Sequence, residues 1–216
     1  MSQTYGKTSW KRFALVMVPS IAATAAIGVG LASSALAASF SVSGQDFKVT
    51  VADLDGTNFA QYGGVDNGLG AKHPIAVSAF DTATLTNLCQ SVTTDLSALH
   101  LGTWTLKLKA GGDGTPATAT NMLIGLENLS ADATFDNPDA AGKPQALGGI
   151  NIGQDASTVG GFSKGQVGGF GQYAPHAHLT NVKQTAWSTS AGTFKLPGLH
   201  LSVAQKDGNE PGNECY

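Results

Sequence analysis

Alternation of apolar and polar residues is the feature that most limits the fold of this chain. It occurs in three segments: QDFKVTVAD at 45–53, GTWTLKLKA at 102–110 and GLHLSVAQ at 198–205. Because successive side chains of a β-strand point to opposite faces, a period of two predicts half-buried strands. Glycine-rich segments at 61–70, 110–116, 136–145 and 206–214 predict turns or loops. The pattern therefore predicts an all-β fold, an antiparallel sandwich or flattened barrel with Gly-rich loops.

The segment from 81 to 99 carries two conflicting signals. Its apolar residues have helical spacing, but its interior is rich in Thr and Val, which are poor helix formers. A weak internal repeat favours a strand, because LTNLCQS at 85–91 resembles LTNVKQT at 179–185. The later copy lies in HAHLTNVKQTAWSTS, which has the pattern of a strand. We therefore expect the earlier copy to be a strand as well.

The repeat also bears on the topology. The two copies begin at 85 and 179, and a third, LENLSAD, begins at 126, so the spacing is too irregular for a solenoid of fixed period. A duplicated antiparallel arrangement fits better. The alternative is a β-solenoid, which the recurring apolar-x-Asn-apolar turns suggest.

The N-terminal segment predicts export. Lys7, Lys11 and Arg12 precede a stretch without charge from 13 to 37, and this stretch ends in Ala35-Leu36-Ala37. A positive start, an apolar run and an A-x-A site are typical of a secretory signal. We expect a signal helix at 1–37 that is removed, and a single β-rich extracytoplasmic domain at 38–216. The alternative is that the 25-residue apolar span stays as a membrane anchor.

The charge of residues 38–216 argues against nucleic acid as a partner. This part has nine lysines, no arginine and fifteen acidic residues, which gives a net charge of −6. A surface that binds phosphates needs clustered cations, usually with arginine among them.

The two cysteines, Cys89 and Cys215, predict a disulfide. Thiols tend to pair in the oxidising compartments that exported proteins reach. The bond would close a loop of about 126 residues and hold the C-terminus, a stabilisation on the order of 3–4 kcal/mol. The alternative is that Cys215 is free or bonds another chain.

Ser163 is the one candidate nucleophile that a motif supports. Residues 161–165, GFSKG, fit the G-x-S-x-G pattern of a nucleophile elbow. That elbow needs a strand before the serine and a helix after it, whereas GQDAST precedes the motif and the glycine-rich QVGGFGQYAP follows it. Histidines lie downstream, but Asp207 follows all of them, the reverse of the hydrolase order. We therefore interpret Ser163 as part of a flexible surface loop.

His176 and His178 alternate, so they lie on one face of the predicted strand. Such a pair could bind zinc, but no further ligand stands at a diagnostic spacing. We interpret the pair as the solvent-facing polar edge of a strand, and we expect no metal and no cofactor. Asp53-Leu54-Asp55-Gly56 is similar to the start of a calcium loop, but the later positions fail, so it is expected to be a turn that ends a strand.

Two phenylalanines are the candidate binding residues. Phe162 and Phe170 lie in a loop too rich in glycine to bury them well. Exposed aromatic side chains often mark a contact surface. The loop could bind an envelope lipid, a polymer or a partner.

The whole pattern resembles a known family. The leader TSWKRFALVMVPSIAATAAIGVGLASSALAASFSVSGQDFKV, followed by QYGGVD, LTNLCQS, NIGQDAS and FKLPGLHLSV, is similar to a family of uncharacterised actinomycete exported proteins. Members often carry the automatic label cholesterol esterase, which implies an ester hydrolase. The resemblance also implies a partner in the cell envelope, a small integral membrane protein.

These observations favour a non-catalytic exported protein of the cell envelope with a structural, adhesive or lipid-binding role, secreted or held at the cell surface. The motivation is the export signal, the β-rich pattern and the lack of a coherent set of catalytic groups. The alternative is a sterol or lipid ester hydrolase that uses Ser163 with His176 or His178.

Overall fold

The computed structural model describes residues 41–42, 44–68, 72–138, 148–205 and 214–216. The chain divides into two units, Met1–Ser39 and Phe40–Tyr216, and every described residue belongs to the second. The expected signal helix at 1–37 lies outside the described residues. Among those described, no helix has the length and apolar character needed to cross a membrane.

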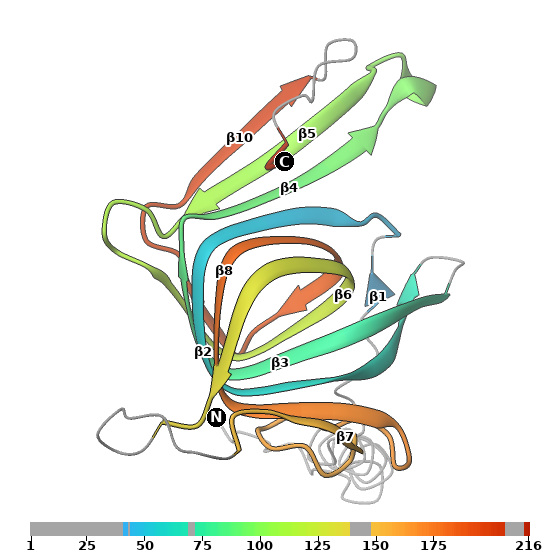
Figure 1. Ribbon diagram of the computed structural model, residues 1–216. Coiled ribbons are helices and arrows are strands. Elements are labelled where there is room, and N and C mark those ends of the chain that lie inside the picture. Colours follow the sequence, from blue (N-terminus) through green and yellow to red (C-terminus); the bar gives the residue numbers. More distant parts are fainter. Residues whose placement is uncertain (1–40, 43, 69–71, 139–147, 206–213) are drawn as a thin grey trace, which may run out of the picture. The chain divides into compact units, whose positions relative to one another are not determined.

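The second unit is built from β-strands, as the alternation predicts (Figure 1). A single turn of 3-10 helix, Ser97–Leu99, accompanies them. The strands are β1 (Ser41–Val42), β2 (Phe47–Gly68), β3 (Lys72–Thr86), β4 (Leu88–Asp95), β5 (Thr103–Ala110), β6 (Ala117–Asp136), β7 (Asn151–Asp155), β8 (Phe170–Ser190), β9 (Thr193–Lys195) and β10 (His200–Gln205).

Four long strands form a closed ring. β2 pairs with β3, β3 with β6, β6 with β8, and β8 with β2, all antiparallel. The remaining strands extend from this ring, with β4, β5 and β10 on one side and β7 beside β8. The all-β antiparallel prediction is therefore confirmed. The solenoid alternative is wrong, because a solenoid stacks parallel coils and the only parallel pair among the described strands joins β1 to β2.

The main core lies inside the ring. Met122 and Val182 are among its most buried side chains, and the ring of Phe59 stacks on that of Phe135 and meets that of Phe80 at a tilt. Burial of such side chains is the main favourable term in the stability of the fold.

Four Thr-Asn-apolar triplets interrupt the long strands. Each asparagine has the left-handed backbone conformation, which asparagine tolerates better than other residues with a side chain. Around one of them, Leu179 and Val182 are both buried, at a spacing of three instead of two. The asparagine thus adds one residue and turns the strand while the same face stays buried. Figure 1 shows β2 and β8 curving sharply. The four are Asn58, Asn87, Asn121 and Asn181, with φ of 51°, 54°, 49° and 55°.

Glycine within these strands marks close packing, which corrects two predictions. β2 runs through Asp53-Leu54-Asp55-Gly56, expected as a turn, and through most of 61–70, expected as a loop. A Cβ on Gly56 would collide with the ring of Phe80, and a Cβ on Gly64 would lie 2.7 Å from a methyl group of Val77. In the ring, glycine therefore admits a large neighbour on the next strand.

The segment 81–99 is extended, as expected from its repeat. It forms the end of β3 and all of β4, separated by Asn87, and closes with Ser97–Leu99.

Candidate binding surface

The loop from 156 to 169, between β7 and β8, is braced at its base by Asp155. The Asp155 carboxylate accepts hydrogen bonds from the backbone N–H of Ser157 at 2.8 Å, the Ser157 hydroxyl at 2.7 Å and the backbone N–H of Gly168 at 2.8 Å. The bonds from Ser157, together with that from Gly168, lower the pKa of Asp155. One carboxylate thus ties the two ends of the loop together.

The middle of the loop packs on the ring. Ala156 and Val159 are buried against Tyr62 and Tyr173 in a second apolar cluster. A Cβ on Gly165 would lie 2.6 Å from the Cβ of Ala156, so only glycine fits there without a shift. The loop is therefore a rigid structure.

Asp81 of β3 binds the same loop from the neighbouring ring. Its carboxylate accepts hydrogen bonds from the backbone N–H of Phe162 at 2.9 Å and from the side-chain amide of Asn58 at 2.7 Å. The Asn58 side-chain oxygen in turn accepts a bond from the hydroxyl of Tyr173 at 2.6 Å. One of the strand bends thus also fixes the position of the loop.

Ser163 is a buried residue of this loop, so the interpretation of it as part of a flexible surface loop is wrong. Its side chain is 4% exposed, and its hydroxyl shares a hydrogen bond of 2.5 Å with the hydroxyl of Tyr62. Burial raises the pKa of Tyr62, and the bond to Ser163 offsets part of that effect. The segment after Ser163 has no helix, and the next regular element is the strand β8. The geometry of a nucleophile elbow is therefore not formed by the described residues.

The braced loop and the adjoining strand ends expose large apolar side chains. Val167 stands in the turn from Gln166 to Gly169, and Phe170 opens β8 with its ring edge beside Gly153. The hydrogen bonds to Asp155 and Asp81 fix the backbone of the loop that carries Phe162 and Val167. Rigidly presented apolar groups are typical of contact surfaces. The apolar loop surface consists of Ile152, Phe162, Val167 and Phe170, which are 67%, 41%, 85% and 62% exposed.

Sequence reasoning found half of this surface. Phe162 and Phe170 are exposed as predicted, whereas Ile152 and Val167 were missed. The signal for Val167 was available, because a lone valine between Gln166 and two glycines has no apolar periodicity to bury it.

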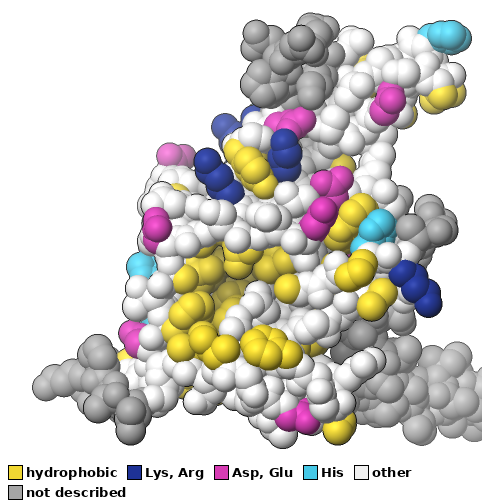
Figure 2. Space-filling view, turned by 45° about the vertical axis from the view of Figure 1, so that its right-hand side comes forward, with side chains coloured by type: hydrophobic (Ala, Val, Ile, Leu, Met, Phe, Trp, Pro, Cys, Tyr) yellow, Lys and Arg dark blue, Asp and Glu magenta, His cyan; other side chains and the backbone are white. Residues whose placement is uncertain are grey.

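A further apolar area is visible in the space-filling view. Figure 2 shows hydrophobic side chains gathered in a hollow on one face of the molecule, with charged groups around the hollow.

His176 and His178 pair with aspartates on the outward face of the ring. His176 contacts Asp136 at 2.5 Å through Nδ1 and Asp55 at 2.8 Å through Nε2, and His178 contacts Asp53 at 2.7 Å. β8 lies between β2 and β6 at this point, so the prediction of a strand edge is wrong, although the face is polar.

The contacts of His176 affect its titration. Burial lowers the pKa of His176, but the hydrogen bonds to Asp136 and Asp55 outweigh it, and the pKa is raised. The two carboxylates thus favour the protonated form of His176. The arrangement does not bring either imidazole to Ser163. The described residues contain no group of three or more His, Cys, Asp or Glu side chains that could hold a metal ion.

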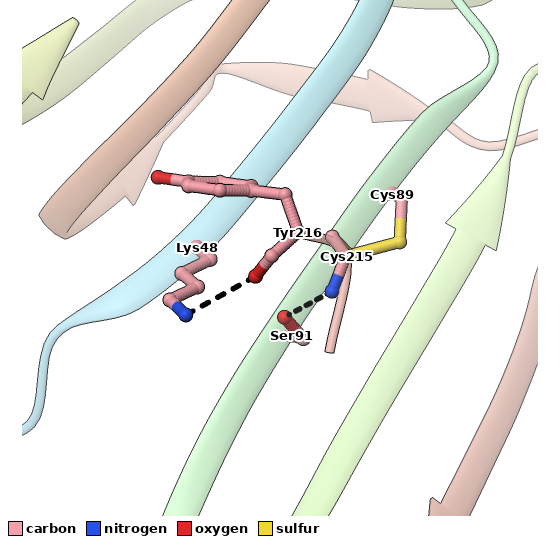
Figure 3. Close-up of a disulfide and its surroundings, with 5 residues drawn as sticks. All are labelled: Lys48, Cys89, Ser91, Cys215 and Tyr216. Carbon is pink, nitrogen blue, oxygen red and sulfur yellow. Dashed lines mark hydrogen bonds between the residues drawn. A yellow bond between two sulfur atoms is a disulfide. The ribbon is translucent and has the colours of Figure 1, made fainter. Parts of the chain in front are cut away.

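The disulfide between Cys89 and Cys215 is present as predicted (Figure 3). It fixes the C-terminus on β4, where the Cys215 N–H donates to the Ser91 hydroxyl at 3.0 Å. Lys48 donates to the carbonyl oxygen of Tyr216 at 3.1 Å and lies 5.3 Å from the centre of its ring. Beside the bond is an open pocket of about 450 Å³, lined by Asn87, Leu88, Cys89, Lys107, Lys109, Ala110, Gly112, Asp113, Gly198 and Cys215.

The comparisons with known proteins identify a family and nothing narrower. A model described as a family of unknown function (DUF6230) matches residues 43–216, which is nearly the whole β-rich unit. No curated protein and no solved structure matches the chain.

Proposed function

The chain belongs to this family of unknown function, and we propose from its own residues that it is a non-catalytic, exported protein of the cell envelope that binds lipid. The observation that carries the proposal is the apolar loop surface, whose four side chains are exposed on a hydrogen-bonded loop and on the strand ends beside it. A structural or adhesive role toward an envelope polymer would use the same surface and is distinguished by the experiment below.

Export is supported by the sequence. The leader has the order of a secretory signal, and the chain resembles exported actinomycete proteins. The disulfide is consistent with an oxidising compartment. On this proposal the protein works outside the cytoplasm, where it can contact a membrane surface.

The energy available from the surface is that of a weak, reversible contact. Full burial of an Ile, Val or Phe side chain is worth about 1.5–3 kcal/mol, so Ile152, Val167 and Phe170 together offer roughly 5–9 kcal/mol before the cost of association. Once the cost of association is subtracted, the binding free energy is expected to be no greater than the marginal one that a single acyl chain provides. Lys164, in the middle of the loop, donates to the carbonyl oxygen of Val159. Binding is therefore expected to depend little on salt.

The test is co-sedimentation of the exported chain with vesicles of phosphatidylcholine and phosphatidylglycerol. We expect saturable binding that persists in high salt and falls at least tenfold in the double variant Val167→Ser/Phe170→Ser, because about 3–5 kcal/mol of apolar burial is removed. Val203→Ser is the matched control, since Val203 is 62% exposed on β10, at the opposite end of the strand order from β7 and β8. Equal loss in the control, or no binding by the wild type, contradicts the proposal.

Two further experiments distinguish the alternative functions from lipid binding. Binding to isolated cell wall but not to vesicles would indicate an adhesive role. Hydrolysis of a sterol ester that Ser163→Ala abolishes would indicate the ester hydrolase that the resembling family's label implies.

A further inference from the structure

Two lysines of β5 lie on the same side of the sheet as the disulfide. Lys107 and Lys109 alternate along the strand, and they stand opposite Ser91 and Cys89 of β4. Residues that face each other across two strands lie on one side of the sheet, so both lysine side chains leave the sheet beside the disulfide. The pocket next to the disulfide, about 450 Å³ in volume, is lined by both lysines, Cys89 and Cys215. The disulfide therefore forms one wall of a pocket that also carries two positive charges.

These two positive charges repel each other. Partial burial and the charge of nearby Lys109 lower the pKa of Lys107. Asp113 is the one acidic residue that lines the pocket, and Lys109 forms no ion pair with Asp113 or with any other residue that the structure describes. An anion bound between the two ammonium groups would favour the charged form of both. The electrostatics of the pocket thus suit a negatively charged ligand.

The loop that follows β5 adds backbone donors to the same pocket. Gly112 and Asp113 line the pocket, in a turn with positive φ at Gly111, Asp113 and Gly114. Among the described residues, no group accepts a hydrogen bond from the backbone N–H of Gly112 or Asp113. Successive N–H groups in a turn form a concave site that binds anions. The pocket therefore combines two ammonium groups with two backbone donors.

We propose that this pocket binds the phosphate group of a small polyol ester, with both lysines and the two backbone N–H groups around the phosphate. A phosphate ester carries up to about two negative charges and three strong acceptor oxygens, which match these donors. The pocket volume lies within the range of about 300–1,000 Å³ for small-molecule sites, so it has room for the organic part of the ester. The side chains of Asn87 and Asp113 also line the pocket and can hydrogen-bond to hydroxyl groups of a polyol.

Isothermal titration of the exported chain with sn-glycerol 3-phosphate tests the proposal. We expect saturable binding that weakens as salt is added, because exposed charges are screened. We also expect weaker binding of inorganic phosphate and none of glycerol, since the phosphate and the hydroxyl groups both contribute. No binding of sn-glycerol 3-phosphate would overturn the proposal, and equal affinity for inorganic phosphate would refute a site for an ester.

Variants of the two lysines assign the binding to this pocket. Lys107→Gln/Lys109→Gln should raise the dissociation constant for sn-glycerol 3-phosphate by about tenfold or more, because two charge-assisted hydrogen bonds are lost. Lys107→Arg/Lys109→Arg keeps both charges and should retain binding. Lys72→Gln, at an exposed lysine of β3, is the matched control and should leave the dissociation constant unchanged. Equal loss in Lys72→Gln, or no loss in the glutamine double variant, contradicts the assignment.

Vesicles identify what carries the phosphate. Phosphatidylglycerol presents a polyol phosphate as its headgroup, whereas phosphatidylcholine carries choline in place of the polyol. If a lipid headgroup is the source, the glutamine double variant should lose affinity at low salt for phosphatidylglycerol vesicles but not for phosphatidylcholine vesicles. If a soluble ester is the source, only the titration with sn-glycerol 3-phosphate should change.

The inference is independent of lipid binding by the apolar loop surface. β4 and β5 lie toward the opposite end of the strand order from β7 and β8. Val167→Ser/Phe170→Ser should therefore keep its affinity for sn-glycerol 3-phosphate. A parallel loss of that affinity would contradict a separate phosphate site.

Discussion

Asn121 offers the clearest test of how the long strands bend. It is exposed, lies in β6 and has a φ of 49°. A side chain with a Cβ costs about 1–2 kcal/mol in the left-handed region, a cost that asparagine reduces and glycine avoids. We expect Asn121→Ala to lower the free energy of unfolding by about 1–2 kcal/mol, and Asn121→Gly to change it by less than about 0.5 kcal/mol.

Asn128 of the same strand is the matched control. It is exposed, and it is not among the residues with positive φ. There the order should reverse, with alanine tolerated and glycine costing about 0.5–1 kcal/mol. Urea denaturation resolves the difference, because 1–2 kcal/mol moves the midpoint by roughly 0.5–1 M at an m-value of about 2 kcal/mol/M. If alanine is as stable as glycine at Asn121, the bend does not depend on the left-handed residue.

Three further outcomes follow from buried and paired groups. Gly125→Ala should cost about 1–3 kcal/mol in urea denaturation, because the added methyl group would press on the Asp66 carboxylate; a change below about 0.5 kcal/mol contradicts the packing. Cys215→Ser removes the disulfide across 126 residues and should cost about 3–4 kcal/mol, seen as a lower Tm; an unchanged Tm contradicts this. The folded pKa of His176 is raised, so its stabilisation is complete below the unfolded value of about 6.5 and is lost as pH rises through the folded pKa. His176→Gln should therefore lower the free energy of unfolding more near pH 5.5 than near pH 8. The opposite trend would show that the His176–Asp136 pair does not stabilise the fold.

The strand content could be predicted because alternation is a local property. The starts of β2, β5 and β10 follow from residues 45–53, 102–110 and 198–205. The ring could not be predicted, since it depends on which strands pair. The pair that closes it, β2 with β8, joins residues more than a hundred positions apart, such as Leu54 and Leu179. Local pattern does not encode such pairing.

Glycine and asparagine were misread for a related reason. Each is a common turn residue, so their clusters predict turns. In this fold Gly56 and Gly64 lie inside β2 against Phe80 and Val77, and Asn58 bends the strand without ending it. The repeated Thr-Asn-apolar triplet was a usable signal, but the sequence alone does not tell a bend from a turn.

The candidate site was predicted in part. Exposure of Phe162 and Phe170 followed from their glycine-rich surroundings. The rigidity of the loop did not, because Asp155 reaches Gly168 thirteen residues later and Asp81 reaches Phe162 from another strand. Contacts of that kind appear only once the chain is folded.

The most direct test of the proposed function is a tryptophan placed in the apolar loop surface by Phe170→Trp. Vesicles that contain brominated lipid acyl chains quench tryptophan only when it enters the apolar layer of the membrane. The account predicts a blue-shifted and quenched emission for Phe170→Trp, with neither change for Val203→Trp on β10, after subtraction of the wild-type emission. Equal emission of both variants with and without vesicles would contradict it.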